Sequence, residues 1–256
     1  MKAGIIAPIA MLEKYATQSD YHLVLAHLVH ESVEYREFYK ARSDAGDFIT
    51  LDNSLIELGH PMPLPALLEA AELVGASEII LPDRFADLSG TLAVTFASYH
   101  TLVNMGMLGR YKLMVVPQGN DALSWLYCYW LFSNTPHFDT IGIAKHTETF
   151  CKGGRPALLH ALIRLEARSP KEHHLLGVWS SPLEVFECSR SFGWLRSVDT
   201  SLPVLAGLHG IQFPDPLRGI TFERPAKPLD FKATEDPHHK ITERNVRLYL
   251  RWAQGG

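Results

Sequence analysis

Short apolar runs of the strand type alternate with longer segments of helical periodicity along most of the 256-residue chain. The alternation is clearest between residues 48 and 199, where most apolar runs are followed by a segment with helix start and stop signals. Strands that alternate with helices in this way are typical of βαβ units and a parallel sheet. We therefore expect an α/β fold and, at this length, a single-domain (β/α)8 barrel of the TIM type.

The pattern also predicts where the individual elements lie. Strands are expected in the first twelve residues and over residues 21–29, 48–52, 78–83, 112–119, 139–144, 173–179 and 194–199, with a closing strand over 202–208. Helices are expected over 32–42, 64–74, 87–105, 122–132, 156–167, 182–191 and 241–253. Asn120 is the predicted cap of the helix over 122–132, and Ser180 or Ser181 that of the helix over 182–191. The barrel should occupy about residues 1–210. An irregular basic segment and a terminal helix follow, over about 211–256.

Composition narrows the class of protein without identifying it. The chain is 46% hydrophobic and 20% charged, which is ordinary for a globular domain, and its net charge is −4. With this net charge, the surface as a whole lacks the basic character that nucleic-acid-binding proteins often show. Contacts with a nucleic acid would therefore need a local basic patch. The C-terminal segment offers one; the alternative is the solvated face of a terminal helix. The candidate nucleic-acid-binding residues are Arg218, Arg224, Lys227, Arg244, Arg247 and Arg251.

The cysteines and histidines give little support for a disulfide framework or a metal site. Cys128, Cys151 and Cys188 are odd in number and show no paired spacing. The histidines form no metal-binding motif that is backed by acidic residues. Pro8 interrupts the apolar N-terminal stretch, which is too short to span a membrane, so we expect a buried strand there and a cytoplasmic protein.

The predicted strands end in polar residues that can take part in catalysis. These residues are Asp52, Asp83, Gln118, Lys145 with His146, and Asp199. In a parallel barrel, the carboxyl ends of successive strands converge on one mouth even when they are far apart in sequence. Any one of these aspartates could instead be a helix cap or turn residue. Asn53 and Ser54 after Asp52, and Thr200 and Ser201 after Asp199, could already serve that purpose.

Two carboxylates in one pocket would suit a reaction at a sugar anomeric carbon. One carboxylate can attack the carbon while the other moves a proton, and negative charge stabilises the oxocarbenium-like transition state. A third carboxylate, Asp83, together with Gln118 and backbone groups near Gly142, could bind the edge of a flat heterocycle. Because an ionised Asp only accepts hydrogen bonds, the paired N–H groups of a guanine-like base would fit it.

The order of these motifs resembles that of the tRNA-guanine transglycosylase superfamily. VVPQG resembles the family's glycine-rich glutamine motif, IGIAKH its GLAVG-like strand and HLLGVWSSP its LMGVGTP-like strand. The resemblance covers about residues 48–203 and implies a (β/α)8 barrel that exchanges guanine in a polynucleotide for a 7-deazaguanine. It implies that Asp199 is the nucleophile, Asp52 the general acid/base and Asp83 the residue that recognises the base.

Other substrate-binding residues follow from the same resemblance or from their position at the predicted mouth. They are Gln118, Gly119, Gly142, Ile143, Ala144, Lys145 and Trp179. Lys145 could contact a phosphate or the 7-substituent, or be a plain surface lysine. Trp179 could stack on a base or belong to the core.

The departures from the family pattern point to its phage-type branch, which acts on DNA. The tRNA enzymes carry a zinc motif after the nucleophile strand, whereas this chain has no cysteine after Cys188, so no metal or other cofactor is expected. LDNSLIELG stands where the family has DSGGFQ, which makes Asp52 a weaker match than Gln118. DNA is the expected partner and a 7-cyano or 7-aminomethyl base the expected substrate, in the host cytoplasm if the protein is phage-encoded.

Three alternatives remain open at this point. The first is the same exchange on tRNA. The second is a barrel hydrolase or lyase that acts on a small nucleoside or sugar, for which the same carboxylates would serve. The third is a non-catalytic sensor of the base. The presence of both Asp52 and Asp199 argues against the sensor, because a sensor needs no nucleophile.

Overall fold

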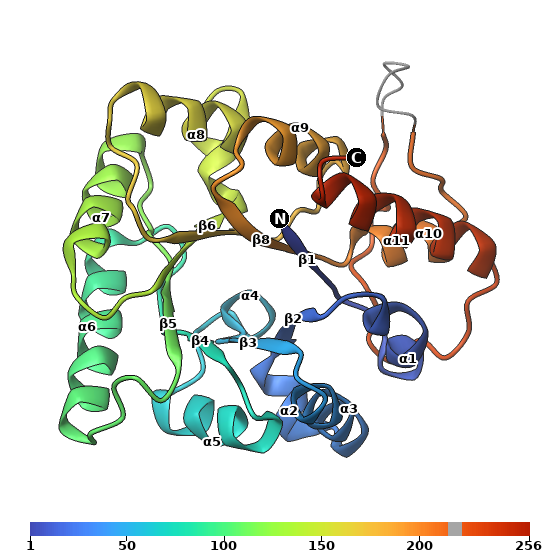
Figure 1. Cartoon of the computed structure of the whole chain (residues 1–256), viewed down its shortest axis with the longest axis horizontal. Coiled ribbons are helices and arrows are strands. Elements are labelled where there is room, and N and C mark those ends of the chain that lie inside the picture. Colours follow the sequence, from blue (N-terminus) through green and yellow to red (C-terminus); the bar gives the residue numbers. More distant parts are fainter. Residues whose placement is uncertain (215–221) are drawn as a thin grey trace. The chain divides into compact units, whose positions relative to one another are not determined.

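In the part of the chain that the structure describes, eight strands alternate with helices to give an α/β fold (Figure 1). The computed structural model describes residues 1–214 and 222–256. Hydrogen-bonded neighbours in the sheet follow the order β1-β8-β7-β6-β5-β4-β3-β2, the order of a (β/α)8 fold. The strands are β1 (Lys2–Ile5), β2 (Tyr21–Leu25), β3 (Phe48–Asp52), β4 (Glu78–Ile80), β5 (Lys112–Val115), β6 (Thr140–Ala144), β7 (Glu172–Leu176) and β8 (Leu195–Thr200). The predicted fold class, an α/β TIM-like barrel, is confirmed.

Most of the predicted helices are present, but the strand predicted over residues 21–29 ends at Leu25, and residues 26–29 belong to the helix α2 (Ala26–Glu31). The α-helices are α1 (Leu12–Tyr15), α2 (Ala26–Glu31), α3 (Val33–Asp44), α4 (Leu55–Leu58), α5 (Leu64–Val74), α6 (Leu88–Asn104), α7 (Ala122–Asn134), α8 (Gly154–Arg164), α9 (Leu183–Ser191), α10 (Leu202–Leu208) and α11 (His239–Ala253). Short 3-10 turns are η1 (Ile9–Met11), η2 (Ala16–Gln18) and η3 (Lys145–Thr149). Two compact units make up the chain. The central unit holds residues 24–174, and the terminal unit holds residues 1–23 and 175–256.

In the central unit, side-chain caps fix where several helices begin. The Asp87 carboxylate accepts a hydrogen bond from the Gly90 amide at the start of α6. Asp121 and Ser124 form a reciprocal capping box at the start of α7. The cap of α7 is therefore Asp121 and not the predicted Asn120. That prediction was wrong by one residue, because the extended backbone of Asp121 places its carboxylate on the Ser124 amide.

The strands of the central unit enclose a polar layer that periodicity does not predict. Glu78 on β4 is fully buried. Its carboxylate accepts hydrogen bonds from the hydroxyls of Thr50 on β3 (2.9 Å) and Thr140 on β6 (2.6 Å). Thr50 pairs with Glu78 in the parallel register. Since buried carboxylates require hydrogen-bond donors, the two threonines account for the presence of Glu78 in the sheet interior.

In the terminal unit, β1 pairs with β8 in parallel, so that Gly4 lies opposite Asp199. The helices α10 and α11 pack side by side (Figure 1). Gly207 on α10 makes this contact possible, because a Cβ there would overlap with Thr242 of α11. The indole of Trp252 on α11 stacks on the ring of Phe213, with 6.1 Å between the centroids.

Two predictions fail in this unit. Residues 202–208 form the helix α10 rather than a closing strand, and Pro203 lies in its first turn. Proline lacks the N–H that an interior strand needs but fits the first turn of a helix, so Pro203 was the signal against a strand. Helix α9 begins at Leu183, with Pro182 rather than a serine as its N-cap residue. The Ser181 hydroxyl still accepts a hydrogen bond from the Leu183 amide at 3.2 Å.

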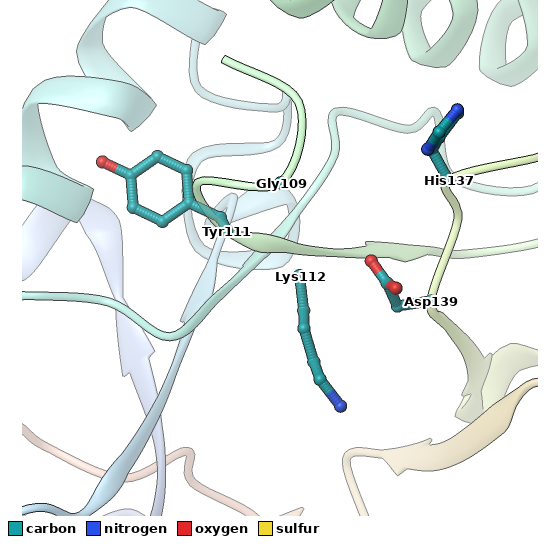
Figure 2. Close-up of a pocket in the computed structure, with 5 residues that line it drawn as sticks. All are labelled: Gly109, Tyr111, Lys112, His137 and Asp139. Carbon is teal, nitrogen blue, oxygen red and sulfur yellow. The ribbon is translucent and has the colours of Figure 1, made fainter.

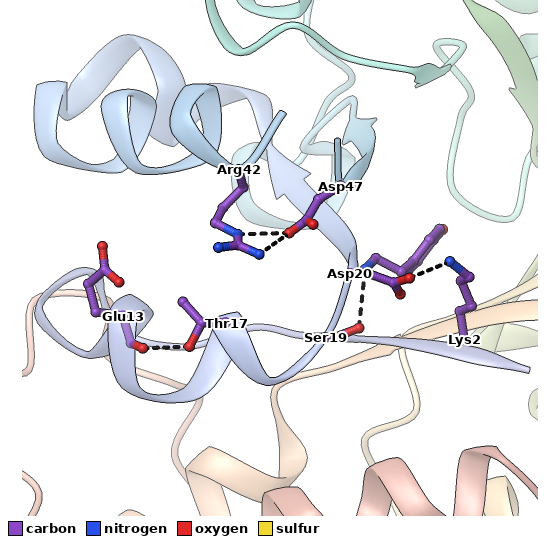
Figure 3. A network of polar contacts seen from close by, with 8 residues as sticks. Lys2, Glu13, Thr17, Ser19, Asp20, Arg42 and Asp47 are labelled. Carbon is purple, nitrogen blue, oxygen red and sulfur yellow. Dashed lines mark hydrogen bonds and ion pairs between the residues drawn. The ribbon is translucent and has the colours of Figure 1, made fainter. Parts of the chain in front are cut away.

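Local ion pairs brace loops within each unit (Figure 3). In the central unit, Nε and Nη2 of Arg42 lie 2.7 and 2.6 Å from one carboxylate oxygen of Asp47, across the turn between α3 and β3. In the terminal unit, Lys2 contacts Asp20 at 2.7 Å with both side chains exposed. An exposed pair of this kind contributes little to stability, whereas the less exposed Arg42–Asp47 pair is better placed to hold its turn.

Candidate active site

Asp83 lies just beyond the end of β4 and is almost completely buried. Both of its carboxylate oxygens accept hydrogen bonds from side-chain amides. Asn53 Nδ2 donates to Oδ1 at 2.8 Å, and Gln118 Nε2 donates to Oδ2 at 2.6 Å. Asn53 follows β3 and Gln118 follows β5, so three neighbouring strand ends contribute to one cluster. The structure thus brings Asp83 and Gln118 together, as their strand-end positions predicted.

Burial dominates the electrostatics of this cluster. It raises the pKa of Asp83 to about 6, even though the amides of Asn53 and Gln118 favour the ionised form. A buried carboxylate is costly when it is held only by neutral donors. A strongly perturbed titratable group at a strand end is a recognised mark of a functional site.

Sequence reasoning treated Asn53 only as a turn residue. Its side-chain Nδ2 also donates to the backbone carbonyl of Leu81 at 3.0 Å, and its side-chain Oδ1 accepts from the backbone amide of Leu55. It therefore links the strand end that carries Asp52 to the carboxylate of Asp83. No local sequence pattern signals this link, because it depends on the register between β3 and β4.

The carboxylate of Asp52, at the end of β3, is held by its own turn. Oδ2 accepts a hydrogen bond from the Ser54 amide at 2.8 Å. Ser54 adopts the left-handed conformation, with φ of 57°, which non-glycine residues rarely occupy. Its hydroxyl oxygen lies 2.9 Å from Nδ1 of His27 and accepts from the His27 amide at 3.2 Å. Burial lowers the pKa of His27, which favours the neutral imidazole at this position.

The end of β6 carries the other predicted pocket residues, Gly142, Ile143, Ala144 and Lys145. The Ile143 carbonyl accepts a hydrogen bond from Nη1 of Arg155 at 2.9 Å, and Arg155 is fully buried. One predicted backbone contact for the base thus already has a structural partner. Lys145 forms an ion pair with Glu148 and its side chain is only 11% exposed, so it is not a plain surface lysine.

Phe85 is a candidate site residue that sequence reasoning missed. It lies two residues after Asp83 and is 56% exposed. Its ring lies 5.2 Å from that of His146, and the His146 Nε2 lies 3.3 Å from the carbonyl of Gly119. An exposed aromatic ring so close in sequence to a buried carboxylate could cover the face of a flat ligand. The signal was the phenylalanine in the polar loop LPDRF.

In the terminal unit, Asp199 on β8 is nearly buried, with 5% exposure. Its Oδ1 accepts a hydrogen bond from the Gly177 amide at 2.9 Å, and its carbonyl accepts from the Val178 amide at 3.1 Å. Gly177 has φ of 63°, a backbone conformation that favours glycine. The loop after β7 is therefore hydrogen-bonded to the strand that carries Asp199. The hydroxyl of Thr200, which donates to the carbonyl of Val178, adds a further contact.

Trp179 follows directly in this loop and is 46% exposed, so it does not belong to the core. The guanidinium carbon of Arg224 lies 4.3 Å from the centre of the Trp179 ring. Burial lowers the pKa of Arg224 from its usual value.

The remaining basic candidates lie on or before α11, except for Arg218, which is outside the described residues. Arg244, Arg247 and Arg251 are exposed and follow the spacing of one helix face. Nη1 of Arg244 also donates to the carbonyl of Phe213 at 3.3 Å. Lys227 is exposed in the preceding loop. The three arginines thus form a basic stripe on α11.

A shallow pocket of about 170 Å³ lies at the opposite, amino-terminal end of β5 (Figure 2). Gly109, Tyr111, Lys112, His137 and Asp139 line it. Its charged groups are engaged: the Asp139 carboxylate accepts from the Leu113 amide at 2.8 Å, and Lys112 pairs with Glu172 at 3.0 Å. Since catalytic groups of such folds lie at the carboxyl ends of the strands, we assign this pocket a structural role.

Comparison with known proteins does not place the chain in a family. No protein-family model matches it, and no curated protein matches it. Within the described ranges, no group of three or more His, Cys, Asp or Glu residues could hold a metal ion. None of the helices described is long and apolar enough to cross a membrane.

Proposed function

We propose that the protein is a transglycosylase that replaces guanine in DNA with a 7-deazaguanine base. Asp199 is the nucleophile, Asp52 the general acid/base and Asp83 the residue that recognises the base. The proposal rests on the motif order in the sequence. The structural observation that best supports it is the buried carboxylate of Asp83 between the amides of Asn53 and Gln118.

The chemistry of Asp83 fits the edge of guanine. That edge offers the N1–H and N2–H donors side by side, and an ionised carboxylate is a pure acceptor with lone pairs on both oxygens. Because the carboxylate is buried, a hydrogen bond from a ligand donor is stronger there than in water. A bidentate donor edge would therefore stabilise the ionised form that burial disfavours. The exposed ring of Phe85 would cover one face of the base.

The reaction we propose has two displacements at C1′. In the first, a carboxylate oxygen of Asp199 forms a bond to C1′ and the bond from C1′ to N9 of guanine breaks, while Asp52 donates a proton to the leaving base. In the second, Asp52 takes a proton from N9 of the incoming base, that nitrogen attacks C1′, and the bond to Asp199 breaks. The reaction needs no water and no redox cofactor, since one glycosidic bond replaces another.

Two features of the carboxylates suit these roles. The Gly177 amide holds one oxygen of Asp199, which orients the carboxylate for attack. The Ser54 amide holds Oδ2 of Asp52. The His27–Ser54 contact stabilises the left-handed turn that makes this hydrogen bond possible.

DNA is the proposed polymer because the chain lacks the cysteine motif of the tRNA enzymes, and the basic stripe on α11 offers phosphate contacts on a surface of net negative charge. The target nucleotide must leave the base stack, which costs a few kcal/mol that phosphate and base contacts have to offset. Binding should therefore be sensitive to salt.

The deciding experiment is exchange of radiolabelled guanine into duplex DNA, single-stranded DNA and unmodified tRNA. We expect label in DNA with the wild-type protein and none with Asp199→Asn, which keeps the shape of the side chain but is a poor nucleophile. Asp44→Asn, at an exposed ion pair on α3, is the matched control and should exchange normally. Label in tRNA alone would keep the chemistry and refute the DNA assignment. No label in any polymer, together with release of free base from a nucleoside, would favour the small-molecule hydrolase.

A further inference from the structure

Trp179 and Arg224 form a cationic aromatic pair in the terminal unit. The guanidinium carbon lies 4.3 Å from the centre of the indole, within the usual range of a cation–π contact. The indole is nevertheless 46% exposed. By contrast, Trp125 and Trp252 serve purely for packing and are at most 2% exposed. A tryptophan that only tied two segments together would be expected to resemble those two.

Arg224 also carries an unsatisfied hydrogen-bond donor. Its Nε atom is buried and has no hydrogen-bond partner among the described residues. Leaving a buried donor unsatisfied is unfavourable, and buried donors in proteins are nearly always paired. A guanidinium that stacks on an exposed indole while one of its donors is unpaired is suited to an anionic ligand that brings both an acceptor and a flat ring.

The loop that carries Trp179 is fixed to the strand of Asp199. The amides of Gly177 and Val178, the two residues before Trp179, donate to the carboxylate and the carbonyl of Asp199. The backbone just before Trp179 is therefore hydrogen-bonded to the residue that we propose as nucleophile.

We propose that Trp179 and Arg224 form a platform for one unpaired nucleotide of the nucleic acid, next to the nucleotide that reacts. The base stacks on the indole, and its phosphate accepts hydrogen bonds from the guanidinium. This inference deepens the proposed function and rests on it. The extrusion of the target nucleotide unstacks its neighbour, and the platform gives that neighbour a new stacking partner. Because stacking is tolerant of sequence, the platform contributes affinity without selecting the base.

Binding of a short single-stranded DNA, measured by fluorescence anisotropy over a range of salt concentrations, tests the platform. Trp179→Ala should weaken binding about 10-fold, and Trp179→Phe should recover most of the loss. Arg224→Ala should weaken binding and lower the slope of log K against log salt by about one, as expected when a phosphate contact is lost. Arg224→Lys should keep the slope and lose affinity, because lysine has no planar group to stack.

Two control variants separate the platform from general effects. Trp130→Ala removes an indole that is 59% exposed on α7, and Arg190→Ala removes another cation–π contact, to Phe186. Both should bind DNA like the wild type. Thermal unfolding of every variant checks folding. The same series with a single-stranded RNA shows whether the platform distinguishes the two polymers.

The outcomes distinguish this inference from the proposed function. If wild-type protein exchanges guanine and Trp179→Ala and Arg224→Ala bind DNA normally, the platform is refuted and the exchange stands. If both variants lose affinity but the wild type exchanges no base, the platform stands and the proposed reaction fails. If the folded wild type binds neither polymer at low salt, both are refuted.

Discussion

The pKa of Asp83 gives the sharpest prediction about the proposed base-binding site. If an ionised Asp83 binds the donor edge of guanine, acidification must weaken binding. With a pKa of about 6, about one-tenth of the carboxylate is ionised at pH 5, compared with nearly all of it at pH 7.5. The affinity for free guanine should therefore fall about 10-fold between these two pH values, or by about 1.4 kcal/mol.

The same carboxylate should also make the stability of the protein depend on pH, in the opposite direction: stability falls as the pH rises. Its pKa rises from 3.8 to about 6 on folding, so the folded state binds more protons than the unfolded state between these values. The free energy of unfolding therefore falls as the pH rises from about 4 to about 6 and then levels off. At about 1.4 kcal/mol per pKa unit, the ionised carboxylate of the ligand-free protein is destabilised by about 3 kcal/mol.

Carbon-13 NMR of aspartate-labelled protein measures this titration directly, and isothermal calorimetry measures guanine binding over the same pH range. Asp83→Asn identifies the Asp83 signal by its loss, and Asp44→Asn serves as an exposed control that should leave both curves unchanged. Binding of guanine should lower the pKa of Asp83. A carboxyl signal that titrates near 4, or a guanine affinity equal at pH 5 and pH 7.5, would refute the reasoning.

Three further substitutions test how the site is held. Gln118→Ala removes a hydrogen-bond partner of Asp83 and of the Ala86 amide. Urea unfolding should show that the free energy of unfolding falls by about 1–3 kcal/mol, and NMR should show a further rise in the pKa of Asp83. Unchanged values would mean that water replaces the glutamine. Arg155→Ala should lower the free energy of unfolding by about 3 kcal/mol or more in the same assay, because it leaves a cavity at a fully buried position and removes the hydrogen bond to the Ile143 carbonyl. A smaller loss would show that the surrounding structure collapses around the alanine. Gly207→Ala should cost about 1–3 kcal/mol, because its Cβ would overlap with α11, whereas Gly193→Ala, with open space around it, should be close to neutral; equal effects would contradict the packing argument.

The positions of the predicted catalytic residues could be derived from sequence because they depend on the ends of strands. The apolar runs that end at Asp52 and Asp199 correspond to β3 and β8, and Asp83 and Gln118 lie just beyond β4 and β5. Periodicity and turn residues are local properties of the sequence, so they can be recognised without knowledge of the tertiary structure. The exposed stripe of arginines on α11 followed from helical spacing in the same way.

The contacts that fill the site were not predictable by the same means. The amide of Asn53 reaches Asp83 only because of the register between β3 and β4, and the residue itself looks like an ordinary turn former. The buried Glu78 departs from the apolar pattern of its strand, and its threonine partners lie on other strands. The stacking of Arg224 on Trp179 joins residues 45 positions apart, and Arg224 lies outside any helix or strand, where there is no periodicity to interpret.

The hydrogen bonds around Asp83 run in one direction. The Leu55 amide donates to the side-chain Oδ1 of Asn53, and the Ala86 amide donates to the side-chain Oε1 of Gln118. Neither side-chain amide can rotate by half a turn without losing its backbone donor, so both must present N–H to Asp83. The polarity of this cluster is thus determined by the main chain, and a ligand that bound Asp83 would have to supply donors. An attempt to make the proposed site accept a base with an acceptor edge would therefore have to remodel the main chain at residues 55 and 86, and exchanging the side chain at position 83 would not suffice.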